Sequence, residues 1–87
     1  MLYFIVKSNV YFVYAIKSMV KEYIYVGMTN DLTRRLNQHN SGWNRSTKPY
    51  IPFNLIYQEQ CASRAVARTR EKYWKSASGK RKLKGMG

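Results

Sequence analysis

The chain has 87 residues, a length that forms one domain with a single modest hydrophobic core. Its 45% hydrophobic content excludes a disordered chain, and its net charge of +12 and pI near 10.2 make a polyanion the expected partner. Nucleic acid is the favoured polyanion, and an anionic membrane is the alternative. The charge is concentrated late in the chain, because residues 64–87 hold nine basic side chains and one acid, Glu71.

The lone cysteine, Cys61, allows no internal disulfide and favours a reducing, cytoplasmic setting. The longest uncharged run near the start, residues 8–16, is shorter than the ~20 apolar residues of a membrane span. Residues 2–6 are apolar, but they lack the preceding basic segment and the following cleavage site of a signal peptide. We therefore expect a cytoplasmic protein that binds nucleic acid, does not bind a membrane and uses no small-molecule cofactor.

The first two strands are predicted from residues 11–16 and 23–28, which are rich in β-branched and aromatic side chains. The polar stretch between them predicts a hairpin in which Lys17 lies opposite Glu22 as a cross-strand charge pair. In this register Tyr14 lies opposite Tyr25. Because side chains alternate along a strand, both tyrosines should point to one face of the sheet.

The remaining elements follow from capping and turn signals. A helix over residues 31–40, with Asn30 as N-cap, should end at the Asn-Ser-Gly sequence of residues 40–42. Residues 43–52 read as a loop and residues 53–58 as a third strand. Ser63 should cap a second helix from residue 64 to about residue 76. Gly79 should end that helix and leave a mobile tail.

The element order β-β-α-β-α predicts an α+β fold, in which a three-stranded, mostly antiparallel sheet is flanked by helices. The domain should span residues 11–84. Residues 1–10 read either as an N-terminal extension or as an extra edge strand, and residues 85–87 as a tail.

A helical wheel of residues 31–40 singles out one arginine and the histidine. His39 falls within roughly 20° and Arg35 within roughly 60° of the inward-facing Leu32, whereas Arg34 points away. The bland interpretation is an arginine that reaches to water beside a satisfied histidine. The functional interpretation is a guanidinium that binds phosphate in bidentate geometry, since the chain has few acids to pair with it.

Glu71 shares a predicted helix face with Ala67 and Trp74. It is either a surface acid paired with Lys75 or Arg68, or a metal ligand. Mg²⁺ is often held by only one or two carboxylates, with waters and substrate phosphates completing its coordination, so one glutamate is enough. No second carboxylate is placed for a two-metal site, and no zinc-spaced set or phosphate-binding glycine loop occurs in the sequence.

Taken together, these residues resemble the GIY-YIG nuclease family, in particular its small single-domain bacterial members. The two tyrosine motifs that name the family occur here as residues 12–14 (Phe-Val-Tyr) and 25–27 (Tyr-Val-Gly), with ten residues between Tyr14 and Tyr25. The first motif keeps only its tyrosine, and the second has valine for isoleucine. The resemblance covers about residues 11–84; residues 1–9 and the family's late asparagine have no counterpart.

This resemblance implies a metal-dependent endonuclease that hydrolyses phosphodiester bonds in nucleic acid, with DNA favoured over RNA as the substrate. It implies that Arg35 stabilises the phosphate, that Glu71 holds one Mg²⁺ or Mn²⁺, and that Tyr25 positions water or phosphate. Tyr14 would assist the attacking water, which requires its pKa to fall from ~10, with Lys17 or His39 as the nearby cation. Whether Tyr14 or His39 is the principal base is left open.

Phosphates flanking the cleaved bond should be bound without sequence readout. The candidates for these contacts are Arg45, Lys48, Lys80, Arg81, Lys82 and Lys84. The rival to an enzyme is a non-catalytic, basic nucleic-acid-binding module, which explains the charge and the aromatic residues. It does not explain why the tyrosines, arginine, histidine and glutamate occur together in this order.

Overall fold

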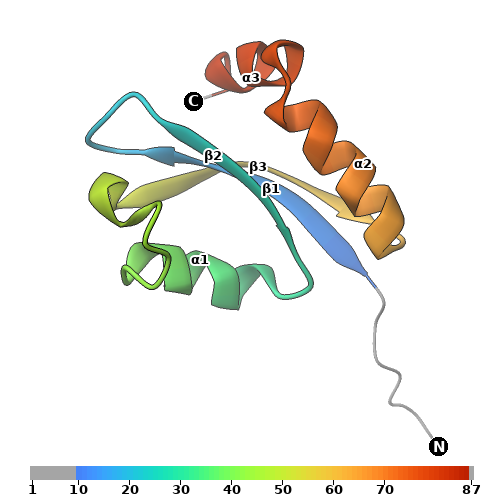
Figure 1. Cartoon of the computed structure of the whole chain (residues 1–87), viewed down its shortest axis with the longest axis horizontal. Helices are drawn as coiled ribbons and strands as arrows, with labels where there is room; N and C mark the ends of the chain where they lie inside the picture. Colours follow the sequence, from blue (N-terminus) through green and yellow to red (C-terminus); the bar gives the residue numbers. More distant parts are fainter. Residues whose placement is uncertain (1–9, 87) are drawn as a thin grey trace, which may run out of the picture.

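The computed structural model describes residues 10–86, in the element order β-β-α-β-α-α (Figure 1). The elements are β1 (Tyr11–Ser18), β2 (Ile24–Thr29), α1 (Leu32–Asn40), a 3₁₀ turn (Lys48–Tyr50), β3 (Phe53–Cys61), α2 (Arg64–Lys75) and α3 (Ala77–Lys84). The predicted α+β fold is confirmed, with one helix more than expected. The question of an extra edge strand at residues 1–9 lies outside the described residues.

The sheet has the strand order β2-β1-β3, and both strand pairs are antiparallel. The predicted hairpin register is wrong by two residues, because Tyr14 pairs with Gly27 and Lys17 pairs with Ile24. The strand continues to Ser18, whose buried hydroxyl donates to the Tyr50 carbonyl at 2.7 Å. A register shift of two residues leaves every side chain on the same face of the sheet, so Tyr14 and Tyr25 still point to one face.

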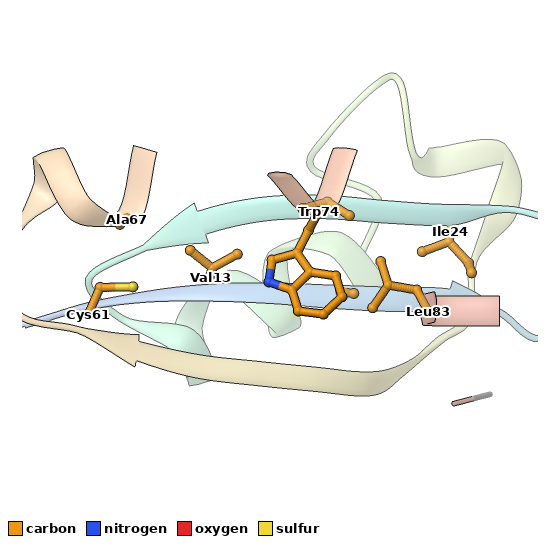
Figure 2. Packing of buried hydrophobic residues seen from close by; sticks show 8 residues of the cluster. Val13, Ile24, Cys61, Ala67, Trp74 and Leu83 are labelled. Atoms are coloured by element: carbon orange, nitrogen blue, oxygen red, sulfur yellow. The ribbon is translucent and has the colours of Figure 1, made fainter. Parts of the chain in front are cut away.

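The fold has three layers, with α1 on one face of the sheet and α2 and α3 on the other (Figure 1). The central strand β1 is buried on both faces, and its alternation separates two cores. Tyr14 and Ile16 pack with Phe53 on the α1 side. Val13 and Ala15 pack on the other side in the core drawn in Figure 2, which includes Trp74 and Leu83.

The C-terminal segment is a helix, and the predicted mobile tail is wrong. Ser76 ends α2 and also caps α3, where its hydroxyl accepts from the Gly79 amide at 3.2 Å. A Cβ atom at position 79 would lie 2.6 Å from the Trp74 Cα, so only glycine allows α3 to fold back on the end of α2. Leu83 then becomes fully buried under the sheet's α2 face (Figure 2).

The predicted helix ends are partly confirmed. The N-cap of α1 is Asp31 rather than Asn30, because the Asp31 side chain accepts from the Arg34 amide. Gly42 follows α1 with φ of 83°, and Ser63 caps α2 as expected. Among the described residues, no helix has the length and apolar character needed to cross a membrane.

Candidate active site

Four of the predicted site residues meet on the α1 face of the sheet. Tyr14 comes from β1, Tyr25 from β2, and Arg35 and His39 from α1. The ring centroid of His39 lies 5.9 Å from that of Tyr14 and 4.8 Å from that of Tyr25. The Arg35 guanidinium interacts with both tyrosine hydroxyls. Residues far apart in sequence therefore form one compact polar cluster.

The Tyr14 side chain reaches the edge of the sheet because its strand neighbour is a glycine. A Cβ atom at Gly27 would lie 2.6 Å from the Tyr14 hydroxyl oxygen, so the phenol ring occupies the space that a side chain would fill. No positive φ is involved, and the glycine is required for this close approach alone.

His39 is fully buried at the centre of a chain of hydrogen bonds. Its Nε2 lies 2.8 Å from the Tyr14 hydroxyl, and its Nδ1 lies 3.1 Å from Thr47 Oγ1. Thr47 is also fully buried, and its hydroxyl donates to the Asn44 carbonyl at 3.3 Å. Sequence reasoning missed Thr47, because it lies in a segment that reads as a loop.

The electrostatics of the cluster differ from expectation. Burial raises the pKa of Tyr14 from 10.0 to about 12, although the neighbouring Arg35 guanidinium opposes this shift. Burial, reinforced by Arg35, lowers the pKa of His39 from 6.5 to about 4, so its imidazole is neutral at pH 7. His39 therefore brings no positive charge to Tyr14. Lys17 does not either, since it pairs with Ile24 and points to the other face.

The two adjacent arginines have different surroundings, as the helical wheel predicts. Arg35 is partly buried beside the tyrosines, and its Nη1 donates to Gln38 Oε1 at 3.0 Å. Arg34 is exposed, and its side chain forms only a loose ion pair of 3.8 Å with Asp31. The guanidinium of Arg35 is thus the one that faces the polar cluster.

Glu71 extends from α2, in the opposite layer, and its negative charge makes a small contribution to the raised pKa of Tyr14. The side chain is 16% exposed and forms an ion pair of 3.2 Å with the more exposed Lys75. No group of three or more His, Cys, Asp or Glu side chains gathers within residues 10–86. One carboxylate completed by water and phosphate oxygens is a donor set that suits Mg²⁺.

A second acid, Glu59, belongs to a separate network that sequence reasoning missed. Its carboxylate accepts from Arg70 Nε at 2.5 Å, from Trp74 Nε1 at 3.1 Å and from the Tyr57 hydroxyl at 2.6 Å. The Arg70 guanidinium, followed by these other donors, lowers the pKa of Glu59 to about 2. Glu59 lies on β3 and its partners Arg70 and Trp74 lie on α2, so these hydrogen bonds connect the strand to the helix.

The basic residues proposed for phosphate binding lie outside the cluster. Arg45 and Lys48 are exposed on the segment after α1, and Arg81, Lys82 and Lys84 are exposed on α3. Lys80 is partly buried and donates to the Ile24 carbonyl at 2.7 Å. Together with Lys17 and Lys84 it lines a cavity of about 340 Å³ between the hairpin and α3. Lys80 therefore has a structural contact, and the Lys82 ammonium also lies over the Tyr73 ring, 5.5 Å from its centroid.

Comparison with known proteins identifies the family to which the chain belongs. The family model described as the GIY-YIG catalytic domain matches residues 10–84. The chain belongs to the GIY-YIG family. Membership of this family indicates a nucleic-acid substrate and nuclease chemistry in general terms.

Several bacterial proteins are similar to this GIY-YIG chain over much of its length. UPF0213 protein YazA of Bacillus subtilis is 34% identical over 77 residues, which cover 87% of this chain and 77% of that protein. UPF0213 protein lwe0147 of Listeria welshimeri is 36% identical, with 87% and 84% covered. UPF0213 protein DP2720 of Desulfotalea psychrophila is 38% identical, with 68% and 56% covered. No solved structure matches this chain.

Proposed function

We propose that this protein is a metal-dependent endonuclease that hydrolyses phosphodiester bonds in nucleic acid, with DNA preferred to RNA. The observation that carries the proposal is the convergence of Tyr14, Tyr25, Arg35 and His39 within electrostatic reach of Glu71. A binding module has no need of a buried tyrosine–histidine pair beside an arginine. A hydrolase does, because it must activate water and stabilise negative charge at the same phosphate.

Arg35 binds the scissile phosphate in this mechanism. Its guanidinium is partly buried and lacks a carboxylate partner among the described residues, so its charge is available to an anion. A partly desolvated guanidinium also stabilises the additional charge that develops on the phosphate in the transition state. Tyr25, which interacts with the same guanidinium, positions the phosphate or the attacking water through its hydroxyl.

Tyr14 and His39 act together as the proton acceptor. Because the pKa of Tyr14 is raised to about 12, its hydroxyl keeps its proton in the free protein and donates a hydrogen bond to neutral His39. As water attacks phosphorus, it transfers a proton to the Tyr14 oxygen while the Tyr14 proton moves to His39 Nε2. A bound phosphate offsets the charge of Arg35, which makes His39 more basic once substrate is present.

Glu71 would hold the single Mg²⁺ or Mn²⁺ ion. The ion would neutralise charge on the phosphate and stabilise the leaving oxygen. Glu71 suits this role because its one ion-pair partner within residues 10–86 is Lys75, whose side chain is 52% exposed and can turn towards solvent. The low exposure of Glu71 itself keeps the carboxylate oriented.

Flanking phosphates are bound by the exposed basic residues. Arg45 and Lys48 lie in the segment that follows α1. Three further exposed basic residues lie on α3: Arg81, Lys82 and Lys84. Lys80 adds charge but is anchored to Ile24. These contacts provide affinity that depends on salt and carries no sequence information.

The proposal is tested by incubating the protein with single-stranded, duplex and branched DNA, and with matched RNA. Mg²⁺ or Mn²⁺ should support cleavage of at least one DNA form, EDTA should abolish it, and DNA should be cut faster than RNA of the same form. Binding without cleavage of any form, with both metals tried, would instead establish a non-catalytic nucleic-acid-binding module.

A further inference from the structure

We propose that Thr47 is a positioning residue that holds His39 in the tautomer with its proton on Nδ1, so that Nε2 accepts the Tyr14 proton. The catalytic consequence rests on the proposed nuclease function. The tautomer itself is a property of the free protein, and it can be measured without any nucleic acid.

The direction of the hydrogen bonds follows from what each group can donate. The Tyr14 hydroxyl proton needs an acceptor, and the neighbouring Arg35 guanidinium offers donors only, so this proton points to His39 Nε2. A neutral imidazole has one N–H, which is then on Nδ1 and donates to the Thr47 oxygen. The Thr47 hydroxyl proton is left free to point towards the Asn44 carbonyl.

The opposite tautomer has no equally complete set of partners. It would turn the Thr47 proton towards His39, while the Asn44 carbonyl would keep the Thr47 and Lys48 amides as donors. It would also require the Tyr14 proton to find another acceptor, and the neighbouring Arg35 guanidinium offers donors only. Loss of that acceptor is costly here, because Tyr14 and His39 are both fully buried.

The backbone around Thr47 is itself fixed by local hydrogen bonds. The Asn44 carbonyl accepts from the amides of Thr47 and Lys48 at 3.1 and 3.0 Å. The Asn44 side chain accepts from the Ser46 amide at 3.0 Å. A short turn after α1 therefore presents the Thr47 hydroxyl to His39 in one orientation, which is what a positioning role requires.

His39 is the only histidine in the chain, so ¹⁵N NMR reports its tautomer without ambiguity. We expect the unmodified protein at pH 7 to show the proton on Nδ1. Thr47→Val keeps the shape but removes the hydroxyl, and it should shift the population towards Nε2–H. Thr47→Ser keeps the hydroxyl and should retain the original tautomer. Thr33→Val, at an exposed position of α1, is the control for the substitution itself.

With a cleaved substrate in hand, Thr47→Val should lower the saturated rate roughly 10–100-fold, the usual cost of losing a group that orients a functional histidine. Affinity should stay unchanged, and Thr47→Ser should restore the rate. The proposal is overturned if the unmodified protein carries the proton on Nε2, or if Thr47→Val leaves the tautomer unchanged. The spectrum of the unmodified protein decides this even if Thr47→Val does not fold. Absence of cleavage would count against the nuclease function and leave the tautomer assignment standing.

Discussion

The ring of Tyr14 lies directly over Gly27 on the neighbouring strand, where a Cβ atom would come within 2.6 Å of the Tyr14 hydroxyl oxygen. The same hydroxyl is 2.8 Å from His39 Nε2. Any side chain at position 27 must therefore push the Tyr14 hydroxyl away from its partner. The glycine of the second tyrosine motif thus has a steric role in the geometry of the first.

We expect Gly27→Ala to lower the cleavage rate by at least an order of magnitude, because proton transfer requires hydrogen-bond distance between the two groups. Overpacking should cost a further ~1–3 kcal/mol of folding free energy. Gly85→Ala is the control, since the nearest atom to its Cβ would be the Lys82 carbonyl oxygen at 3.5 Å. Saturated rate and melting temperature should be measured on both variants. A wild-type rate in Gly27→Ala would show that the close approach does not matter for function.

The adjacent arginines form a second matched pair. Arg35→Ala should reduce the rate roughly 10²–10³-fold, because it removes a group that stabilises charge at the phosphate. Arg34→Ala should have little effect on the rate, since its side chain is exposed and forms a loose ion pair with Asp31. Single-turnover rates at saturating DNA provide the comparison. Equal losses in the two variants would mean that Arg35 is no more than part of a diffuse basic surface.

The pH dependence of stability should report the buried histidine. The pKa of His39 is about 4 in the folded chain and near 6.5 in the unfolded chain, so below pH 6.5 the unfolded state binds the extra proton. Stability from this group is complete above pH 6.5 and decreases as pH falls towards 4. Between pH 7 and pH 5 the loss should be about 2 kcal/mol.

Denaturant unfolding at pH 7 and pH 5 measures this loss, and His39→Gln is the control because it has no histidine to titrate. Glu59, with its pKa lowered to about 2, stays ionised in the folded state over this range. If the unmodified protein and His39→Gln lose the same free energy between the two pH values, His39 is not buried in its neutral form.

The last helix should matter for stability, in contrast to what the sequence alone suggests. Leu83 extends from α3 into the core and is fully buried, so Leu83→Ala should lower the free energy of unfolding by roughly 2–5 kcal/mol. Lys84→Ala, at the next and exposed position, should change stability by less than about 0.5 kcal/mol. Thermal or denaturant unfolding of both variants tests this. Near-identical stabilities would mean that α3 is not packed in solution.

The fold could be predicted because its strands and first helix carry strong local signals. The hairpin register was misjudged, since β1 runs on to Ser18, whose amide donates to the Tyr23 carbonyl and whose hydroxyl accepts from the Val20 and Lys21 amides of the turn. The face of Tyr14 and Tyr25 was nevertheless correct, because only the parity of the register determines it. For α3, Gly79 misled the prediction: glycine usually ends a helix, whereas here it allows two helices to pack closely.

The site could be predicted in part. Arg35 and His39 were placed correctly by helical periodicity, which is a local property. The electrostatics were not, because burial determines the pKa values of Tyr14 and His39, and burial depends on the whole fold. Thr47 carries one signal that sequence could have offered: a threonine shortly after the helix that holds the only histidine.

The most direct test of a metal-dependent nuclease compares two substitutions that each remove one negative charge. Glu71→Gln alters the proposed metal ligand, and Glu22→Gln alters an exposed glutamate on the hairpin. Single-turnover cleavage at saturating DNA with Mg²⁺, and DNA affinity measured on the same samples, should be compared with the unmodified protein. The account predicts that Glu71→Gln loses cleavage but still binds DNA, whereas Glu22→Gln keeps both. Full cleavage by Glu71→Gln would contradict it.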